Sequence, residues 1–398
     1  MAPNTVATRR TLIYFSAKYL PSMGGVEFFT DNLCKELLSR GYEIYIVCIG
    51  TAGTFSPIAD SQSHSENHLN IIRLHGWGWK RAPFIYWDSH TKACINKIKS
   101  LHPDYIMINT RLYGLSRYAA KLANSLGMRP VLLDHGTSHV ALSNSLLSYL
   151  SAKAEHVVTQ RLKMFDIDYY GISEQSSNWL KHFGIKSCGE INNAIDAQRF
   201  IAMRSERNYR SEFGLDDNVL LVIFAGRLLE IKGIDIFLNA ARKLSHNKKL
   251  HFFVAGTGEL QQKVVQMQHA LPNLNYLGRL NHSDLAALLT DGDIFCLPSV
   301  SEGMSTSLLE AAVCSTALIT TKVGGVKEII PDASHGIILP DRSVKSLVQA
   351  ISTLEKDRKL LSQLKQNEEQ FVKKEINWSH TANQAIAALE YSKRKNKK

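Results

Sequence analysis

The chain has 398 residues, of which 44% are hydrophobic, and its formal net charge is +11. This length exceeds one ordinary domain and the apolar content is ample for buried cores, so we expect two globular domains. The apolar runs are far shorter than the roughly 18 residues of a membrane span, which excludes a transmembrane segment within the sequence. Six scattered cysteines, with neither a CxxC pair nor a His/Cys cluster at metal-ligand spacing, favour reduced thiols in a cytoplasm.

The first apolar run, from Thr11 to Ala17, follows two arginines, as the apolar core of a signal peptide does. Lys18 interrupts the run and no small-residue cleavage site follows it. A first buried strand is therefore the better interpretation.

Short apolar runs rich in β-branched residues alternate with amphipathic stretches of helical length, which is typical of βα units around parallel sheets. The pattern occurs twice. In the first half we predict strands at 11–16, 43–49, 70–74, 105–108, 130–134 and 169–172. In the second half we predict strands at 220–224, 251–255, 274–276, 294–297, 317–320 and 336–339.

A polar linker after Asn192-Asn193-Ala194-Ile195-Asp196 separates the two halves, so we place the first domain at 1–194 and the second at 195–375. The helical pattern that ends near Tyr391 lies well beyond the last strand. We expect a closing helix, 376–391, that returns to the first domain, followed by a solvated basic tail, 392–398.

Glycines follow several of the predicted strands, and open α/β sheets bind ligands beyond the carboxyl ends of their strands. Gly24-Gly25 precedes a helix, where small residues let backbone N–H groups approach an anion, although a tight surface turn is the better interpretation of a lone Gly-Gly. Gly256-Thr257-Gly258 does not continue as GxGxxG, which argues against a dinucleotide-dependent dehydrogenase. The absence of GxxxxGK[ST] excludes a P-loop NTPase.

Two cations follow the strand at 220–224, in the run Ala225-Gly226-Arg227 to Lys232-Gly233. Arginine can clamp two phosphate oxygens while lysine acts as a point charge, so the pair would suit a pyrophosphate. Ordinary surface charge is the alternative, and the position at the carboxyl end of a strand favours the phosphate site.

A second cluster lies in Ser301-Glu302-Gly303-Met304-Ser305, which follows a strand and precedes a helix that contains Glu310. The backbone amides of Gly303 to Ser305 would point from the helix start at a bound anion, and the two glutamates could accept hydrogen bonds from sugar hydroxyls. Without further context, a capping Glu302 and a partly exposed helical Glu310 are the alternative.

The order and spacing of these motifs resemble the retaining family 4 glycosyltransferases. The motifs are Gly-Arg-x4-Lys-Gly, Gly-x-Gly, Pro-Ser-x2-Glu-Gly-x6-Glu-Ala and Val323-Gly324-Gly325. Asp134-His135-Gly136 and Ile172-Ser173-Glu174 stand where that family has comparable first-domain motifs. The resemblance covers nearly the whole chain and implies an α/β protein of GT-B fold, in which two Rossmann-like domains face each other across a cleft.

The resemblance also implies a role for each matching residue. Arg227 and Lys232 would hold the donor diphosphate, which Gly24 and Gly25 would approach from the first domain. Glu310 would contact the ribose, with Gly256 and Gly258 nearby in the donor site. Glu302, Gly303, Met304 and Ser305 would contact the transferred sugar, and His135 would lie near the reaction centre. Met304-Ser305 replaces the common Phe-Gly, and Ala194 stands where glycine is usual.

No Asp-x-Asp motif is suited to holding a metal on the diphosphate, so we expect cations and a helix dipole to stabilise the leaving group, with no metal or other cofactor. Retention in this family implies that the new bond forms on the face that the nucleotide leaves. We therefore assign no catalytic base.

The stretch from Trp77 to Trp87 combines five aromatic residues with Lys80 and Arg81. Such a composition suits a membrane interface with anionic lipid, a surface that stacks acceptor sugars, or core packing. Basic residues outnumber acidic ones in 1–190, which favours the membrane. The apolar stripe between Leu146 and Phe165 predicts a helix packed on the sheet, with membrane docking as the secondary interpretation.

The sequence thus predicts a glycosyltransferase that acts at the cytoplasmic face of the plasma membrane. It would move a sugar from a nucleotide-sugar to a lipid-linked glycan or glycolipid in cell-surface polysaccharide or glycoconjugate synthesis, with an anionic membrane and no nucleic acid as a partner. The alternatives are a nucleotide-sugar epimerase, a phosphorylase that needs pyridoxal, and a sugar-nucleotide-binding protein without turnover.

Overall fold

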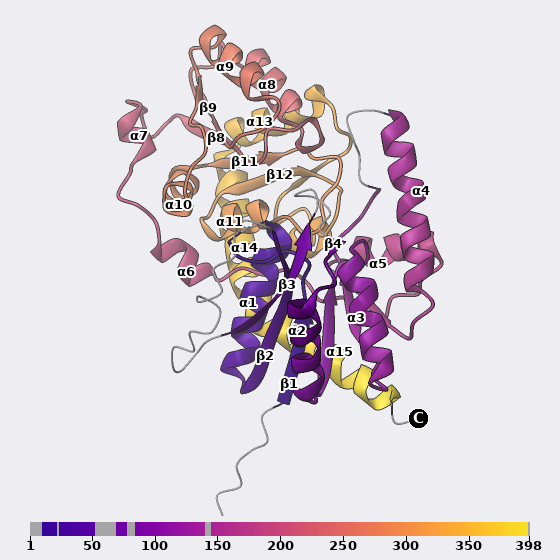
Figure 1. Cartoon of the computed structure of the whole chain (residues 1–398). Helices are drawn as coiled ribbons and strands as arrows, with labels where there is room; N and C mark the ends of the chain where they lie inside the picture. Colours follow the sequence, from indigo (N-terminus) through magenta and orange to yellow (C-terminus); the bar gives the residue numbers. More distant parts are fainter. Residues whose placement is uncertain (1–9, 22–23, 52–68, 78–83, 140–144, 397–398) are drawn as a thin grey trace, which may run out of the picture. The chain divides into compact units, whose positions relative to one another are not determined.

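The structure is a computed structural model of the chain, and it describes residues 10–21, 24–51, 69–77, 84–139 and 145–396. The chain forms two compact units. The first consists of residues 1–192 and 378–398, and the second of residues 193–377 (Figure 1). The chain passes between them at 192/193, where the sequence indicated 194/195.

The first unit is built on a seven-stranded sheet in the order β4-β3-β2-β1-β5-β6-β7. Its strands are β1 Arg10–Phe15, β2 Tyr42–Thr51, β3 Asn70–Trp77, β4 Phe84–Ile85, β5 Tyr105–Asn109, β6 Val131–Asp134 and β7 Asp168–Gly171. Its helices are α1 Gly25–Ser39, α2 Ser89–Ser100, α3 Gly114–Ser125, α4 Ser145–Leu162, α5 Glu174–Leu180, the 3-10 helix η2 Lys181–Phe183 and α15 Trp378–Lys395. All residues of β5, β6 and β7 are buried, as expected of parallel strands covered on both faces.

The second unit is built on a six-stranded parallel sheet in the order β10-β9-β8-β11-β12-β13. Its strands are β8 Leu220–Ala225, β9 Leu250–Ala255, β10 Leu274–Tyr276, β11 Ile294–Leu297, β12 Ala317–Thr321 and β13 Ile337–Leu339. Its helices are α6 Ala197–Ala202, α7 Tyr209–Glu212, the 3-10 helix η3 Glu230–Lys232, α8 Ile234–Lys243, α9 Gln261–Ala270, α10 His282–Asp291, α11 Thr306–Val313, α12 Val326–Ile329, α13 Val344–Lys356 and α14 Arg358–Glu375.

Each strand expected from the sequence is present, and the prediction of two parallel-sheet α/β domains is confirmed. Strand β4 was not predicted. It has only two residues and pairs antiparallel with β3 at the edge of the sheet, so it leaves no periodic signal in the sequence.

The last helix, α15, packs against α1, β5 and β6 and so belongs to the first unit (Figure 1). The expected solvated tail at 392–398 is wrong for its first residues, because α15 continues to Lys395. Lys393 Nζ lies 2.8 Å from Asp104 Oδ1, and Lys395 Nζ lies 2.9 Å from Asp168 Oδ1. These two ion pairs stabilise the C-terminal end of α15.

The stripe on α4 packs on the core as expected only at the C-terminal end of the helix, where Leu162 is fully buried. Leu147, Leu150 and Val157 are 51%, 53% and 51% exposed, while the buried face of the helix carries Glu155 and Thr159. The cause is a buried cation: Arg111 Nη2 lies 2.5 Å from Glu155 Oε1, and this pairing turns the polar face of α4 inward. The part of the apolar stripe from Leu147 to Val157 is left at the surface.

None of the helices in the described part of the chain combines the length and apolar content that a membrane span requires. All six cysteines lie among the described residues and are free thiols.

Candidate functional site

In the second unit, three separate motifs meet at one edge of the sheet. Strands β9, β8 and β11 are parallel neighbours, so their carboxyl ends lie side by side. Gly226 and Arg227 follow β8, Gly256 and Gly258 follow β9, and Glu302 lies five residues beyond β11. The chain therefore places the predicted cation, glycine and carboxylate loops at a common edge.

Two of these glycines permit contacts that no side chain would allow. Gly256 has a φ of 132°, and a Cβ there would lie 1.8 Å from the carbonyl oxygen of Gly226. A Cβ on Gly258 would lie 2.5 Å from the carbonyl oxygen of Leu228. The loops after β8 and β9 therefore pack backbone against backbone, which fixes the segment that carries Arg227.

Lys232 and Glu302, which are 70 residues apart in the chain, form a close ion pair. Lys232 Nζ lies 2.7 Å from both carboxylate oxygens of Glu302, and the Ser299 hydroxyl donates to Oε1 at 2.7 Å. Lys232 ends η3, and Gly233 follows with a φ of 78° against the carbonyl of Pro298. The structure thus brings two predicted site residues together, while the side chain of Arg227, in the loop after β8, is exposed.

The loop from Glu302 to Ser305 is held from the other side by Gly324 and Gly325. Gly324 has a φ of 58° and lies against the carbonyl of Glu302, and Gly325 N donates to Gly303 O at 2.6 Å. A Cβ on Gly325 would lie 2.8 Å from Met304 Cγ. Ser305, the N-cap residue of α11, makes no side-chain capping bond, so the first-turn amides of the helix are not satisfied by that side chain.

Glu310 lies inside α11 and is buried. Burial raises the pKa of Glu310 to about 8. Its carboxyl group is therefore mostly protonated at neutral pH and can donate as well as accept a hydrogen bond.

In the first unit, His135 directly follows β6, and its ring packs edge-on against Phe29 with 5.4 Å between centroids. Burial lowers the pKa of His135 to about 3, so the imidazole is neutral at physiological pH. Its Nε2 lies 3.0 Å from Asn109 Oδ1. Because that oxygen only accepts, Nε2 carries the proton and Nδ1 keeps its lone pair.

Asn109 supports His135 although no sequence motif singles it out. Its side-chain oxygen also accepts from Tyr14 Oη at 3.1 Å, and its amide nitrogen donates to Thr30 Oγ1 at 2.5 Å. Thr110, the next residue, has a φ of 58°, which is unusual for a β-branched residue and is common at functional sites. This network fixes the tautomer and orientation of His135.

Gly24 and Gly25 lie at the start of α1. Gly24 is the N-cap residue and, as a glycine, has no side chain that could cap the helix. A Cβ on Gly25 would meet no atom within 4 Å. The backbone at Gly25 is therefore open to a neighbouring group, whereas a Cβ on Gly24 would lie 2.7 Å from Oε2 of Glu27, whose carboxylate occupies the space beside the N-cap.

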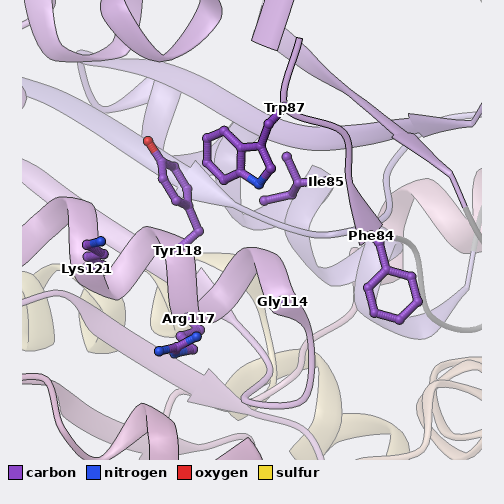
Figure 2. Close-up of a pocket in the computed structure, with 7 residues that line it drawn as sticks. All are labelled: Phe84, Ile85, Trp87, Gly114, Arg117, Tyr118 and Lys121. Carbon is purple, nitrogen blue, oxygen red and sulfur yellow. The ribbon is translucent and has the colours of Figure 1, made fainter. Parts of the chain in front are cut away.

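A pocket of about 360 Å³ lies at the surface of the first unit and combines aromatic with basic side chains (Figure 2). Phe84 and Trp87 are about half exposed, and the Trp87 ring meets that of Tyr118 edge-on with 5.0 Å between centroids. Arg117 and Lys121 of α3 line the same pocket. Of the predicted stretch 77–87, residues 78–83, including Trp79, Lys80 and Arg81, and the side chain of Trp77 lie outside the described residues.

Two parallel-sheet units, with glycine loops, cations and carboxylates at the carboxyl edge of the second sheet, define a protein of GT-B fold. Residues 23–199 match the family described as Glycosyltransferase Family 4, and residues 205–371 match Glycosyl transferases group 1. The chain belongs to the family 4 glycosyltransferases.

Similar proteins support this assignment. An uncharacterised glycosyltransferase of Methanocaldococcus jannaschii is 26% identical, over 89% of this chain and 92% of that protein. One of the subunits of human phosphatidylinositol N-acetylglucosaminyltransferase is 25% identical, over 88% of this chain and 70% of that protein. The crystal structure of Anabaena HepE in complex with UDP has the same fold, with a TM-score of 0.71, 17% identity and coverage of 96% of this chain and 100% of HepE.

Proposed function

We propose that this glycosyltransferase moves a sugar, with retention of its anomeric configuration, from a nucleoside-diphosphate sugar to a lipid-linked acceptor at an anionic membrane surface. The Lys232–Glu302 ion pair at the carboxyl edge of the second sheet carries the proposal. The pair supports the proposal because a lysine suited to a diphosphate lies against a carboxylate suited to sugar hydroxyls, and the amide-rich start of α11 follows in the same loop.

The donor diphosphate binds at Arg227, Lys232 and the start of α11, whose positive charges stabilise the leaving group as its bond to the sugar breaks. Glu302 binds the transferred sugar, and Glu310 binds the ribose hydroxyls. UDP is the first nucleotide to test because HepE, which shares the fold, was crystallised with it.

The transfer step uses no metal on the diphosphate. The Asp-x-Asp pairs at 166/168 and 291/293 support this, since their carboxylates already pair with cations. The ion pairs are Arg129–Asp166, Arg129–Asp168, Lys395–Asp168, Arg204–Asp291 and Arg210–Asp293.

His135 contacts the transferred sugar from the first unit. Its neutral ring and its hydrogen bond to Asn109 hold Nδ1 as an acceptor for a sugar hydroxyl. A neutral ring at this position adds no positive charge beside the oxocarbenium-like transition state of glycosyl transfer.

The acceptor side is supported by two surfaces of the first unit. The pocket beside Trp87 offers aromatic rings and two cations, and α4 exposes the apolar residues Leu147, Leu150 and Val157. Such surfaces suit an interfacial position on anionic lipid. The similarity to part of a phosphatidylinositol N-acetylglucosaminyltransferase favours a lipid acceptor, and the proposed location is the cytoplasmic face of the plasma membrane, in cell-surface glycoconjugate synthesis.

The test is calorimetric titration of UDP into wild type, Lys232→Ala and Arg227→Ala, followed by transfer from UDP-sugars to a lipid acceptor. Loss of a charge-assisted contact should weaken UDP binding by roughly tenfold to a hundredfold and lower turnover with it. Lys243→Ala, at the far end of α8, is the control and should bind as wild type does. Unchanged UDP, GDP and ADP binding in both site variants would overturn the donor assignment.

The metal-independent step has its own test. Transfer measured well below the unfolding temperature should persist in excess EDTA. Loss of activity that added Mg²⁺ or Mn²⁺ restores would contradict the proposed role of the cations and of α11.

A further inference from the structure

Three histidine rings of the first unit converge on one point, outside the residues proposed for transfer. His139 follows β6 in the loop that begins with His135, His156 lies on α4, and His182 lies on η2. Nε2 of His182 lies 3.2 Å from Nε2 of His139 and 3.2 Å from Nε2 of His156. All three ligand atoms lie within 4.8 Å of one another.

These separations fit a tetrahedral metal ion. Zn²⁺ binds imidazole nitrogen at about 2.0–2.1 Å, so two nitrogens on a tetrahedral zinc lie about 3.3 Å apart. Neutral imidazoles arranged around one point are the usual protein ligands of zinc. The spacing therefore matches a metal site more closely than ordinary ring packing, which does not need three Nε2 atoms to meet.

The hydrogen bond of His139 to Glu155 also supports a metal site. Its Nδ1 lies 2.7 Å from Glu155 Oε2, and because a carboxylate only accepts, Nδ1 carries the proton. In the neutral ring, which is the form that binds a metal, the lone pair is then on Nε2, 3.2 Å from Nε2 of His182. A hydrogen bond from His182 could satisfy only one of its two close neighbours, whereas a metal ion accepts all three lone pairs.

The surroundings hold the rings as metal sites require. A ligating histidine generally donates its other N–H to a carboxylate, which Glu155 provides here. Glu155 is itself buried and fixed by Arg111, whose guanidinium lies 4.1 Å from the Phe183 ring centroid. His182 stacks on Trp179 with 4.7 Å between centroids and an interplanar angle of 6°.

We infer that His139, His156 and His182 bind one Zn²⁺ through Nε2, with the fourth position taken by water. The ion fastens the loop after β6, helix α4 and η2 to one another. Its effect is on stability and on the position of α4, whose exposed apolar stripe is the surface proposed to meet lipid. The inference stands independently of the donor chemistry, since it rests on the first unit alone.

The binding test uses the full chain without a histidine tag, freed of metal with EDTA and then dialysed. Zinc affinity is measured by competition with a chromophoric chelator, and geometry by the visible absorption of the Co²⁺ form. We expect one equivalent of zinc and the intense bands of tetrahedral cobalt. His156→Gln and His182→Gln should each weaken zinc binding by at least a hundredfold, and Glu155→Gln by roughly tenfold to a hundredfold.

A matched control is His90→Gln, since His90 also lies close to another histidine of this unit, His75, on which it stacks with 4.1 Å between centroids. It should keep the tight site and its cobalt spectrum. Loss of the site in this variant alone, or zinc binding as tight in His182→Gln as in wild type, would overturn the inference.

Thermal unfolding separates metal binding from damage to the fold. In EDTA, wild type, His156→Gln and His182→Gln should unfold at closely similar temperatures. Zinc at a hundredfold excess over its Kd should raise the Tm of wild type by roughly 5–10 °C and leave both variants unchanged. An equal rise in all three proteins, or no rise in wild type, would contradict the proposed site.

Discussion

In the second unit, glycines hold the site residues in place, whereas in the first unit polar side chains from distant segments do so. Around Arg227 and Glu302, the loops pack backbone to backbone at Gly256 and Gly324. Around His135, the supports are side-chain pairs such as Asn109–Tyr14 and Arg111–Glu155. The first arrangement depends on the absence of side chains, and the second depends on charges and hydrogen bonds. Different kinds of substitution should therefore destabilise the two units.

The largest expected effect is in the first unit, at Arg111. Its side chain is 1% exposed, and it lies 2.5 Å from Glu155 Oε1 and 3.5 Å from Asp134 Oδ2. Arg111→Met would leave two buried carboxylates without their cation and should lower the free energy of unfolding by about 3–5 kcal/mol. Urea unfolding in EDTA measures this loss without any contribution from metal.

Arg129→Met is the matched control, because Arg129 also pairs with a buried aspartate, Asp168, but is itself partly exposed. Asp168 keeps Lys395 and Ser392 as partners, so the loss there should be about 1 kcal/mol. Equal losses in the two variants would show that the Arg111 cluster is not the support of this unit.

In the second unit, the corresponding change is Gly256→Ala. The added Cβ would lie 1.8 Å from the Gly226 carbonyl oxygen at a φ of 132°, so the loops must separate, at a loss of about 2–4 kcal/mol. Thermal unfolding and UDP titration should both register the change. Gly25→Ala, where a Cβ meets no atom within 4 Å, should unfold as wild type does, and a stable Gly256→Ala would refute the backbone packing.

The same contrast explains what the sequence could and could not predict. The second-unit edge was predictable because Gly256, Glu302 and Gly324 belong to short motifs whose spacing is set by local backbone geometry. The pairing of Lys232 with Glu302 was not, because it joins loops 70 residues apart.

In the first unit, the strands were predictable from their apolar runs, but the polar network was not. Arg111 and Glu155 are 44 residues apart, and no periodicity marks a buried ion pair. The stripe on α4 shows the limit clearly: its spacing predicted a helix, but only the Arg111 partner of Glu155 decided which face is buried. The cluster of three histidines could not be predicted for the same reason, since its members come from three separate segments.

A pH-dependent effect is expected at Glu310, whose folded pKa of about 8 lies above its ordinary value of 4.5. Between these values the folded chain binds a proton that the unfolded chain has released, so the contribution of Glu310 to stability falls as pH rises from about 4.5 to 8 and is constant above. Glu310→Gln removes this dependence. Its stability relative to wild type should grow by at most about 1.4 kcal/mol per pH unit over that window.

Calorimetric unfolding of wild type and Glu310→Gln at pH 5, 6, 7 and 8 measures this difference. Glu259→Gln, an exposed neighbour at the same sheet edge, is the control and should follow wild type at every pH. A Glu310→Gln curve parallel to wild type would mean that Glu310 ionises freely in the fold.

The smallest effect per residue concerns the surface of the first unit, where cations at the aromatic pocket are proposed to meet anionic lipid. Each such cation contributes about 1 kcal/mol, so Arg117→Ser with Lys121→Ser should weaken sedimentation with phosphatidylserine vesicles by roughly tenfold to thirtyfold. Lys97→Ser with Lys99→Ser removes the same charge from exposed positions on α2 of the same unit and should have the smaller effect, because neither residue lines the pocket. Added salt should reduce the difference, since the Debye length is only about 8 Å at physiological ionic strength.

Equal weakening in the two variants would mean that net charge alone attracts the vesicle. If the pocket variant sediments as wild type does but loses transfer to a soluble acceptor analogue, the pocket binds the acceptor sugar, and the exposed stripe of α4 is then the surface to test for lipid, by changing Leu150 and Val157 to Ser.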